Sequence, residues 1–176
     1  MKKNLFIWQA GGFTTAVVLG TVLHFLYSWT GAYILTPICA VNESTWEHMK
    51  ILFVPMLFFS VFQFWFFKDY YAGFWWIKLI GTTVAVLSIP ILFYTVNGAF
   101  GKTPDWLNII FFFLSAFFGY FIEYVLFKKD FQLKYPIIAF SILMAVFTIF
   151  AVFTLYTPKI PLFKDPLTNS YGLIKK

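Results

Sequence analysis

The sequence contains little charge, no arginine and a single cysteine. Charged residues make up 11% of the 176 residues, and all 13 basic residues are lysine. With 61% hydrophobic and 24% aromatic residues, the chain differs strongly from an average soluble domain. The lone Cys39 excludes an intramolecular disulfide and a zinc site built from several thiolates. The lysines are scattered rather than clustered, so the net charge of +6 does not indicate nucleic acid as a partner.

Long apolar segments fill most of the chain and predict an all-α integral membrane protein. One crossing needs about 20 apolar residues, so this length holds roughly five spans and leaves no room for a separate soluble domain. We expect one polytopic transmembrane domain over residues 1–176, a bundle of about five helices, with an extramembrane tail at 157–176. The spans are expected at about 5–27, 45–67, 74–96, 106–127 and 135–156.

The segment between the first two spans is expected not to cross the membrane. Residues 30–41 are apolar, but they are about half as long as a span and are interrupted by Pro37. The pattern predicts a short re-entrant or interfacial segment.

Loop lysines predict that the N-terminus is cytoplasmic, because cytoplasmic loops carry an excess of basic residues. The lysines on the N-terminal side are Lys2, Lys3, Lys68, Lys128, Lys129 and Lys134. The interhelical loops of the other side carry mainly Lys102, although four tail lysines weaken this bias: Lys159, Lys164, Lys175 and Lys176. Lysine without arginine and 26 phenylalanines indicate an A- and T-rich gene, so we expect a bacterial plasma membrane.

Ionisable residues concentrate in Asn42-Glu43-Ser44-Thr45-Trp46-Glu47-His48-Met49-Lys50, at the start of the second predicted span. Charged groups are costly to keep at a membrane, so this cluster has either a structural or a functional cause. The structural interpretation is a capping box, Ser44-x-x-Glu47, in which each side chain accepts the other residue's backbone N–H. The positive end of the helix dipole also stabilises acidic residues in the first turn, which would account for Glu43 and Glu47 without any chemistry.

The two histidines favour a functional interpretation. His24 lies about one turn before the outer end of the first span, and His48 about one turn after the outer start of the second. Antiparallel neighbours would hold both imidazoles at similar depth, in one pocket that opens to the outer face with Glu43 at its rim. The alternative for each histidine alone is a single hydrogen bond at the interface. The predicted ligand-binding residues are His24, Asn42, Glu43, Trp46, Glu47, His48 and Lys50.

Catalytic and metal roles are narrower predictions at the same place. Glu47 and His48 are the catalytic candidates, and His24, Glu47 and His48 are the candidate ligands of a divalent metal. The sequence does not require a metal, because the spacing is not that of H-E-x-x-H and no third histidine completes a zinc set.

Glu123 is the one carboxylate well inside a predicted span. Lys78 is expected at a similar depth in the neighbouring span, and intramembrane charges usually pair. We therefore predict a structural ion pair between Glu123 and Lys78. A proton-coupled site would need further polar groups at that depth.

Two motifs at opposite ends of the chain resemble those of a family of small bacterial membrane proteins that carries only a domain-of-unknown-function label. The first is N-E-S-x-W-E-H-x-K at 42–50, followed by Phe53 and Pro55, and the second is P-L-F-x-D-P with Y-G in the tail. The resemblance implies bacterial origin and polytopic topology, not an activity, and it adds Asp165 to the residues of interest. The tail would then be either an ordered lid over the site or a frayed terminus.

Two classes of function follow from these residues. We favour a binding or transport-accessory protein that holds a polar or lipid-derived ligand in an outer-leaflet pocket, with the bilayer as its environment. The alternative is a membrane-embedded acid/base or metal-dependent hydrolase or transferase acting on a lipid or peptide. In that case Glu47 or Glu43 would act as base, and His48 with His24 as acid or metal ligand. The oligomeric state stays open.

Overall fold

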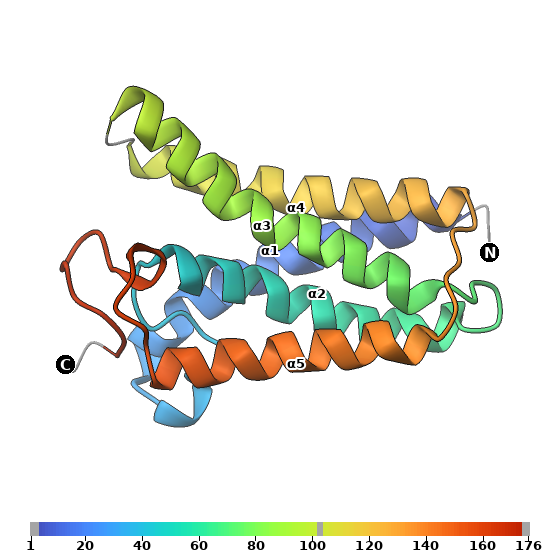
Figure 1. The fold of residues 1–176 in the computed structure, drawn as a ribbon, viewed down its shortest axis with the longest axis horizontal. Helices are drawn as coiled ribbons and strands as arrows, with labels where there is room; N and C mark the ends of the chain where they lie inside the picture. Colours follow the sequence, from blue (N-terminus) through green and yellow to red (C-terminus); the bar gives the residue numbers. More distant parts are fainter. Residues whose placement is uncertain (1–3, 102–103, 174–176) are drawn as a thin grey trace.

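Five long helices make up most of the computed structural model, which describes residues 4–101 and 104–173 (Figure 1). Each of the five is long and apolar enough to span a membrane. This result confirms the predicted all-α, multi-pass architecture. The helices are α1 (Leu5–Thr30), α2 (Thr45–Phe67), α3 (Phe74–Phe100), α4 (Asp105–Lys128) and α5 (Pro136–Leu155).

Two helices run further than the sequence predicted, and each ends where a glycine follows. α1 continues to Thr30, where Gly31 adopts a φ of 63° and donates its N–H to the carbonyl of Tyr27. α3 continues to Phe100 and stops at Gly101, which has a φ of 81°. Glycine adopts this left-handed backbone at little cost, so it terminates apolar helices that composition alone would leave open-ended.

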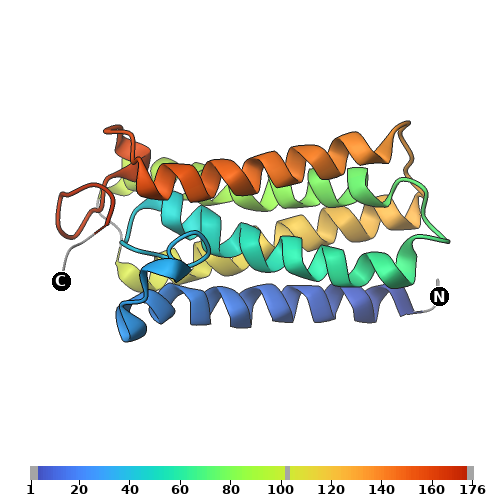
Figure 2. The same cartoon turned by 90° about the horizontal axis from the view of Figure 1, so that it is seen from below.

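The bundle has two distinct ends (Figures 1 and 2). The N-terminus and the α2–α3 and α4–α5 loops lie at one, which we call the N-terminal end. The α1–α2 connection and the tail lie at the other, which we call the tail end. Among the loop lysines, Lys68 and the group 128–134 lie at the N-terminal end, as the orientation argument requires. Lysines 2, 3, 102, 175 and 176 lie outside the described residues.

α2 is the central helix of the bundle. In its most apolar stretch 61% of the residues are buried, against 22–39% in the other four helices. α3 and α4 form the closest pair: a Cβ at Gly119 would lie 2.7 Å from Ala85 Cβ and 2.8 Å from the Gly81 carbonyl oxygen. Small residues permit this approach, as in other membrane bundles. Towards the tail end the α3–α4 pair diverges from α2 and α5 (Figure 1).

The α1–α2 connection holds one short 3-10 helix, η2 (Tyr33–Leu35), and no helix long enough to cross a membrane. Its second half turns back into the bundle, where Ala40 donates its N–H to the carbonyl of Leu23 and Cys39 is fully buried. The polypeptide therefore passes through the interior of the tail end before α2 begins.

The tail is ordered over this end as far as Leu173, the last described residue. Its 3-10 helix η3 (Pro161–Phe163) buries Phe163 against Trp46, with ring centroids 4.5 Å apart. The Asn42 amide donates to the Gly172 carbonyl at 2.8 Å. Of the two alternatives for the tail, the structure therefore shows an ordered cover.

Candidate functional site

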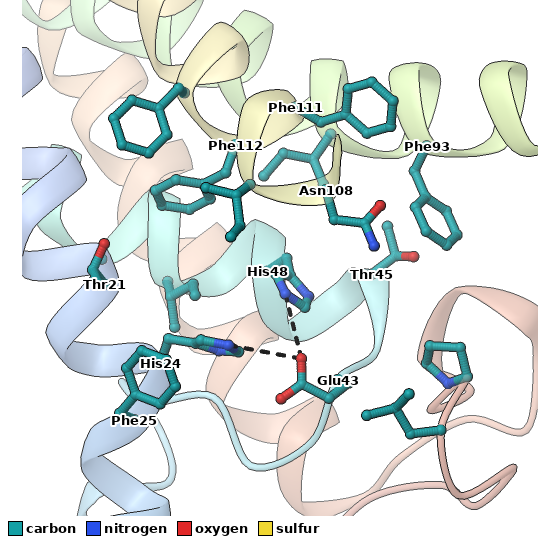
Figure 3. A pocket seen from close by; sticks show the side chains of 17 residues that line it. Thr21, His24, Phe25, Glu43, Thr45, His48, Phe93, Asn108, Phe111 and Phe112 are labelled. Carbon is teal, nitrogen blue, oxygen red and sulfur yellow. Dashed lines mark ion pairs between the residues drawn. The ribbon is translucent and has the colours of Figure 1, made fainter. Parts of the chain in front are cut away.

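Three side chains meet at the tail end between α1 and α2 (Figure 3). Glu43 Oε2 lies 3.7 Å from His24 Nε2 and 3.7 Å from His48 Nε2, and the two imidazole centroids are 5.3 Å apart. One ligand atom from each of the three lies within 4.8 Å of the others. All three are partly buried, so the cluster is reachable but not fully solvated. Its donor set of two imidazoles and one carboxylate suits a divalent transition metal.

The start of α2 fixes His48 in the orientation that this cluster needs. Ser44 caps the helix by accepting the backbone N–H of Glu47, and its carbonyl oxygen lies 2.9 Å from His48 Nδ1. A carbonyl only accepts, so Nδ1 donates this hydrogen bond and Nε2 is the ring nitrogen that faces Glu43. Orientation of a ligating histidine by a backbone carbonyl is common in metal sites.

A cavity of about 520 Å³ adjoins the cluster. Helices α1, α2, α3 and α4 and the tail all contribute to its walls, which are mostly apolar away from the imidazoles (Figure 3). The tail closes one side with Pro166 and Leu167. The residues that line the cavity include His24, Glu43, His48, Ile89, Asn108, Ile109, Phe111 and Phe112.

Two buried polar atoms around this cavity have no hydrogen-bond partner among the described residues. They are Nδ1 of His24 and Oδ1 of Asn108. An unpaired buried polar atom costs roughly 1–3 kcal/mol, so such atoms at a cavity favour a ligand that pairs with them. The cavity therefore combines a polar end with apolar walls, as small-molecule sites commonly do.

The structure separates Glu47 from the histidines. Its carboxylate lies 2.6 Å from the Lys50 ammonium, accepts the Val41 N–H at 3.0 Å and accepts the Thr154 hydroxyl at 3.0 Å. Glu47 is 2% exposed and is not among the residues that line the cavity. The metal set that the geometry forms is thus His24, Glu43 and His48, with Glu43 in the place expected for Glu47. The reason is that Lys50, one turn along α2, provides Glu47 with a buried counterion.

The capping box forms by half. The Ser44 hydroxyl accepts the N–H of Glu47, as predicted. The N–H of Ser44 donates to Asn42 Oδ1 at 2.9 Å, so the prediction that it donates to the Glu47 carboxylate was wrong. Asn42 thereby joins the helix start to the tail. Asn42, Trp46 and Lys50 are buried in these structural contacts and do not line the cavity.

Lys50 is held by a complete set of acceptors. Its ammonium lies 2.6 Å from Glu47 Oε2, donates to the Thr36 carbonyl at 2.8 Å and contacts the Thr154 hydroxyl at 2.8 Å. This network ties the α1–α2 connection, α2 and α5 together beneath the tail. Asp165 stabilises a turn within the tail, where its Oδ1 accepts the N–H groups of Leu167 and Thr168.

The predicted ion pair between Glu123 and Lys78 lies in the opposite half of the bundle. Lys78 Nζ lies 2.6 Å from Glu123 Oε2, and both side chains are fully buried between α3 and α4. Several further polar residues lie inside the helices and were not predicted as site residues. Asn108 at the cavity, Thr154 beside Lys50, and Gln9 and Gln63 in the bundle core were all open to discovery as isolated polar residues inside apolar spans.

The fold and this cavity define a multi-pass helical membrane protein with a candidate site enclosed at its tail end. The chain belongs to DUF6512, a family of unknown function, whose family model matches residues 2–173. This match confirms that the chain falls in a domain-of-unknown-function family. Comparisons with curated proteins and with solved structures found no match.

Proposed function

We propose that the protein binds a lipid-derived amphiphile in the tail-end cavity, in a binding or transport-accessory role. The observation that carries this proposal is the division of the cavity, which has imidazoles, a carboxylate and an unpaired amide oxygen at one end and apolar walls elsewhere. A single amphiphile satisfies both parts. The volume of about 520 Å³ suits a head group with the first part of an acyl chain.

The polar end favours an amine-bearing head group. The Glu43 carboxylate would attract an ammonium, while the amide oxygen of Asn108 would accept a hydrogen bond from one of its N–H groups. An acyl chain would then run along Ile89, Phe111 and Phe112.

The proposed location is a bacterial plasma membrane with the N-terminal end in the cytoplasm. The basis is the lysine content of the loops at that end, including Lys68, Lys128 and Lys129. With this orientation the cavity faces the outer leaflet.

Native mass spectrometry of protein extracted from vesicles of phosphatidylethanolamine and phosphatidylglycerol tests this function. Ile109 lines the cavity and Ile110 does not, so Ile109→Trp adds bulk at the cavity wall, and Ile110→Trp is a matched control at a second exposed position. We expect one retained lipid in the wild type and in Ile110→Trp, and none in Ile109→Trp. Equal retention by all three proteins would contradict a lipid site in the cavity.

A metal-dependent hydrolase or transferase is the second candidate, favoured by the convergence of His24, Glu43 and His48 within 4.8 Å. A divalent ion held there would lower the pKa of a bound water, which could add across an ester bond of a lipid in the cavity. The reaction places the water oxygen on the acyl group and its protons on the solvent and the leaving alcohol.

Isothermal titration of the metal-stripped protein with Zn²⁺ separates the two candidates. We expect saturable binding by the wild type and by Asp69→Asn, a control that removes an exposed carboxylate in the α2–α3 loop. His24→Ala, Glu43→Gln and His48→Ala should each weaken it by at least ten-fold. Binding that survives all three changes would remove the metal candidate and leave the amphiphile site untouched.

A further inference from the structure

A second polar cluster lies in the half of the bundle nearer the N-terminal end, around the Lys78–Glu123 pair. Lys78 Nζ lies 5.6–5.8 Å from the centroids of four aromatic rings, those of Phe59, Phe74, Tyr120 and Phe127. The ammonium is fully buried inside this ring of aromatic side chains. Cation–π attraction supports a charge in such a setting, but it leaves N–H groups without acceptors.

The two buried lysines of the described chain differ in how their ammonium groups are satisfied. An ammonium has three donors. Lys50 has three partners, whereas Lys78 has one, Glu123 Oε2 at 2.6 Å, within residues 4–101 and 104–173. Both side chains are 0% exposed, so bulk solvent does not account for the difference.

Unpaired buried acceptors and donors occur on Glu123 and Tyr120, which contact Lys78, and on two glutamines of α1 and α2. Glu123 Oε1, the Tyr120 hydroxyl, and both amide atoms of Gln9 and of Gln63 have no hydrogen-bond partner among the described residues. Gln9 is 4% exposed, Tyr120 4%, and Gln63 and Glu123 0%. A buried group left unpaired costs roughly 1–3 kcal/mol. A molecule that forms hydrogen bonds with these groups would remove that cost.

Helix geometry places both glutamines on the faces that line this cluster. Gln63 lies one turn from Phe59 and one turn from Phe67, and side chains four apart share a helix face. Gln9 lies one turn before Gly12, where a Cβ would come within 2.7 Å of the rings of both Tyr120 and Phe59. Both glutamines therefore lie on helix faces that carry or contact the rings around Lys78.

The geometry points to an internal water site here: we propose that Gln9, Gln63, Tyr120 and Glu123 hold water against Lys78, and that the ammonium exchanges its protons with this water. Water both donates and accepts, as amides, a phenol and an ammonium together demand, and buried waters typically make about three hydrogen bonds. Lys78 and Glu123 then form a hydrated pair in contact with exchangeable protons, beyond the structural role that pairing alone implies.

Lysine side-chain NMR of the full chain in lipid nanodiscs tests this site, with Lys50 as an internal reference. In protein labelled with ¹⁵Nζ-lysine, the buried ammonium groups are assigned by loss of one signal in Lys78→Met. We expect magnetisation transfer from water to be several-fold stronger for Lys78 than for Lys50. Equal or weaker transfer to Lys78 than to Lys50 in the wild type would overturn the proposal.

Two variants sharpen the result. Gln9→Leu with Gln63→Leu should reduce the transfer to Lys78 to the level of Lys50, while the Lys50 signal itself reports that the tail-end fold is intact. Ser60→Ala is the matched control, because the buried Ser60 hydroxyl already donates to the Met56 carbonyl within α2. Transfer to Lys78 that is unchanged by the double substitution would show that the glutamines do not hold the water.

Discussion

Glu47 Oε2 lies 2.6 Å from the Lys50 ammonium, one turn further along α2, and neither side chain reaches the cavity. This pair anchors the tail end of the bundle, whereas Glu43, four residues earlier, stands beside the histidines. Two carboxylates of one motif thus have different partners, and substitutions distinguish them.

Glu47→Gln should destabilise the fold and spare the cavity. The change leaves the Lys50 ammonium buried without a counterion, which typically costs roughly 3–5 kcal/mol. Thermal unfolding in detergent should show a lower midpoint, whereas Glu43→Gln, at a partly exposed position, should unfold near the wild-type temperature. A Glu47→Gln protein as stable as the wild type would contradict a stabilising role for the Glu47–Lys50 ion pair.

Cys39 should react slowly with maleimides and faster as the pH rises. The side chain is 0% exposed, and this burial raises the pKa of its thiol above the usual value, so little of the reactive thiolate exists near neutral pH. Alkylation rates between pH 7 and pH 9, compared with those of the denatured protein, check this expectation. Rapid labelling of the native protein at pH 7 would show that the α1–α2 connection opens readily.

Lys78 and Glu123 should be energetically coupled. Replacing one partner leaves the other charge buried alone, while replacing both removes the need for pairing. In a double-mutant cycle with Lys78→Met and Glu123→Leu, we expect each single change to lower stability and the double change to cost less than their sum. Additive losses would indicate that the 2.6 Å contact contributes no net coupling.

The orientation of the bundle can be checked with single cysteines in a Cys39→Ser background. Asp130 and Thr168 are both exposed and lie at opposite ends of the bundle. An impermeant maleimide should label Thr168→Cys in intact cells, and Asp130→Cys only after permeabilisation. The reverse pattern would place the cavity in the inner leaflet.

Local signals made most of the fold predictable. Apolar length gave five helices, and the Ser44 cap placed the start of α2 at the predicted residue. Glu47 and Lys50 are three positions apart, so their pairing was also open to prediction from helix geometry. That pair gives Glu47 a buried counterion, which keeps its carboxylate away from the histidines.

Long-range packing set what the sequence could not predict. Ile89, Asn108 and Phe112 join His24 and His48 at one cavity only because α4 packs against α1, and α3 packs against both α4 and α2. Thr154 completes the Lys50 network from a position 104 residues away. No periodicity in an apolar chain specifies which helix faces meet, since nearly every face is apolar.

Photolabelling measures most directly whether the tail-end cavity holds an amphiphile. The probe is a phosphatidylethanolamine with a diazirine in its acyl chain, reconstituted with the protein in vesicles and mapped by peptide mass spectrometry. The account predicts labelling at residues 109–113 of α4 that is lost in Ile109→Trp and kept in Ile110→Trp. Labelling confined to exposed side chains elsewhere, such as Trp65 and Ile137, and equal in all three proteins would contradict it.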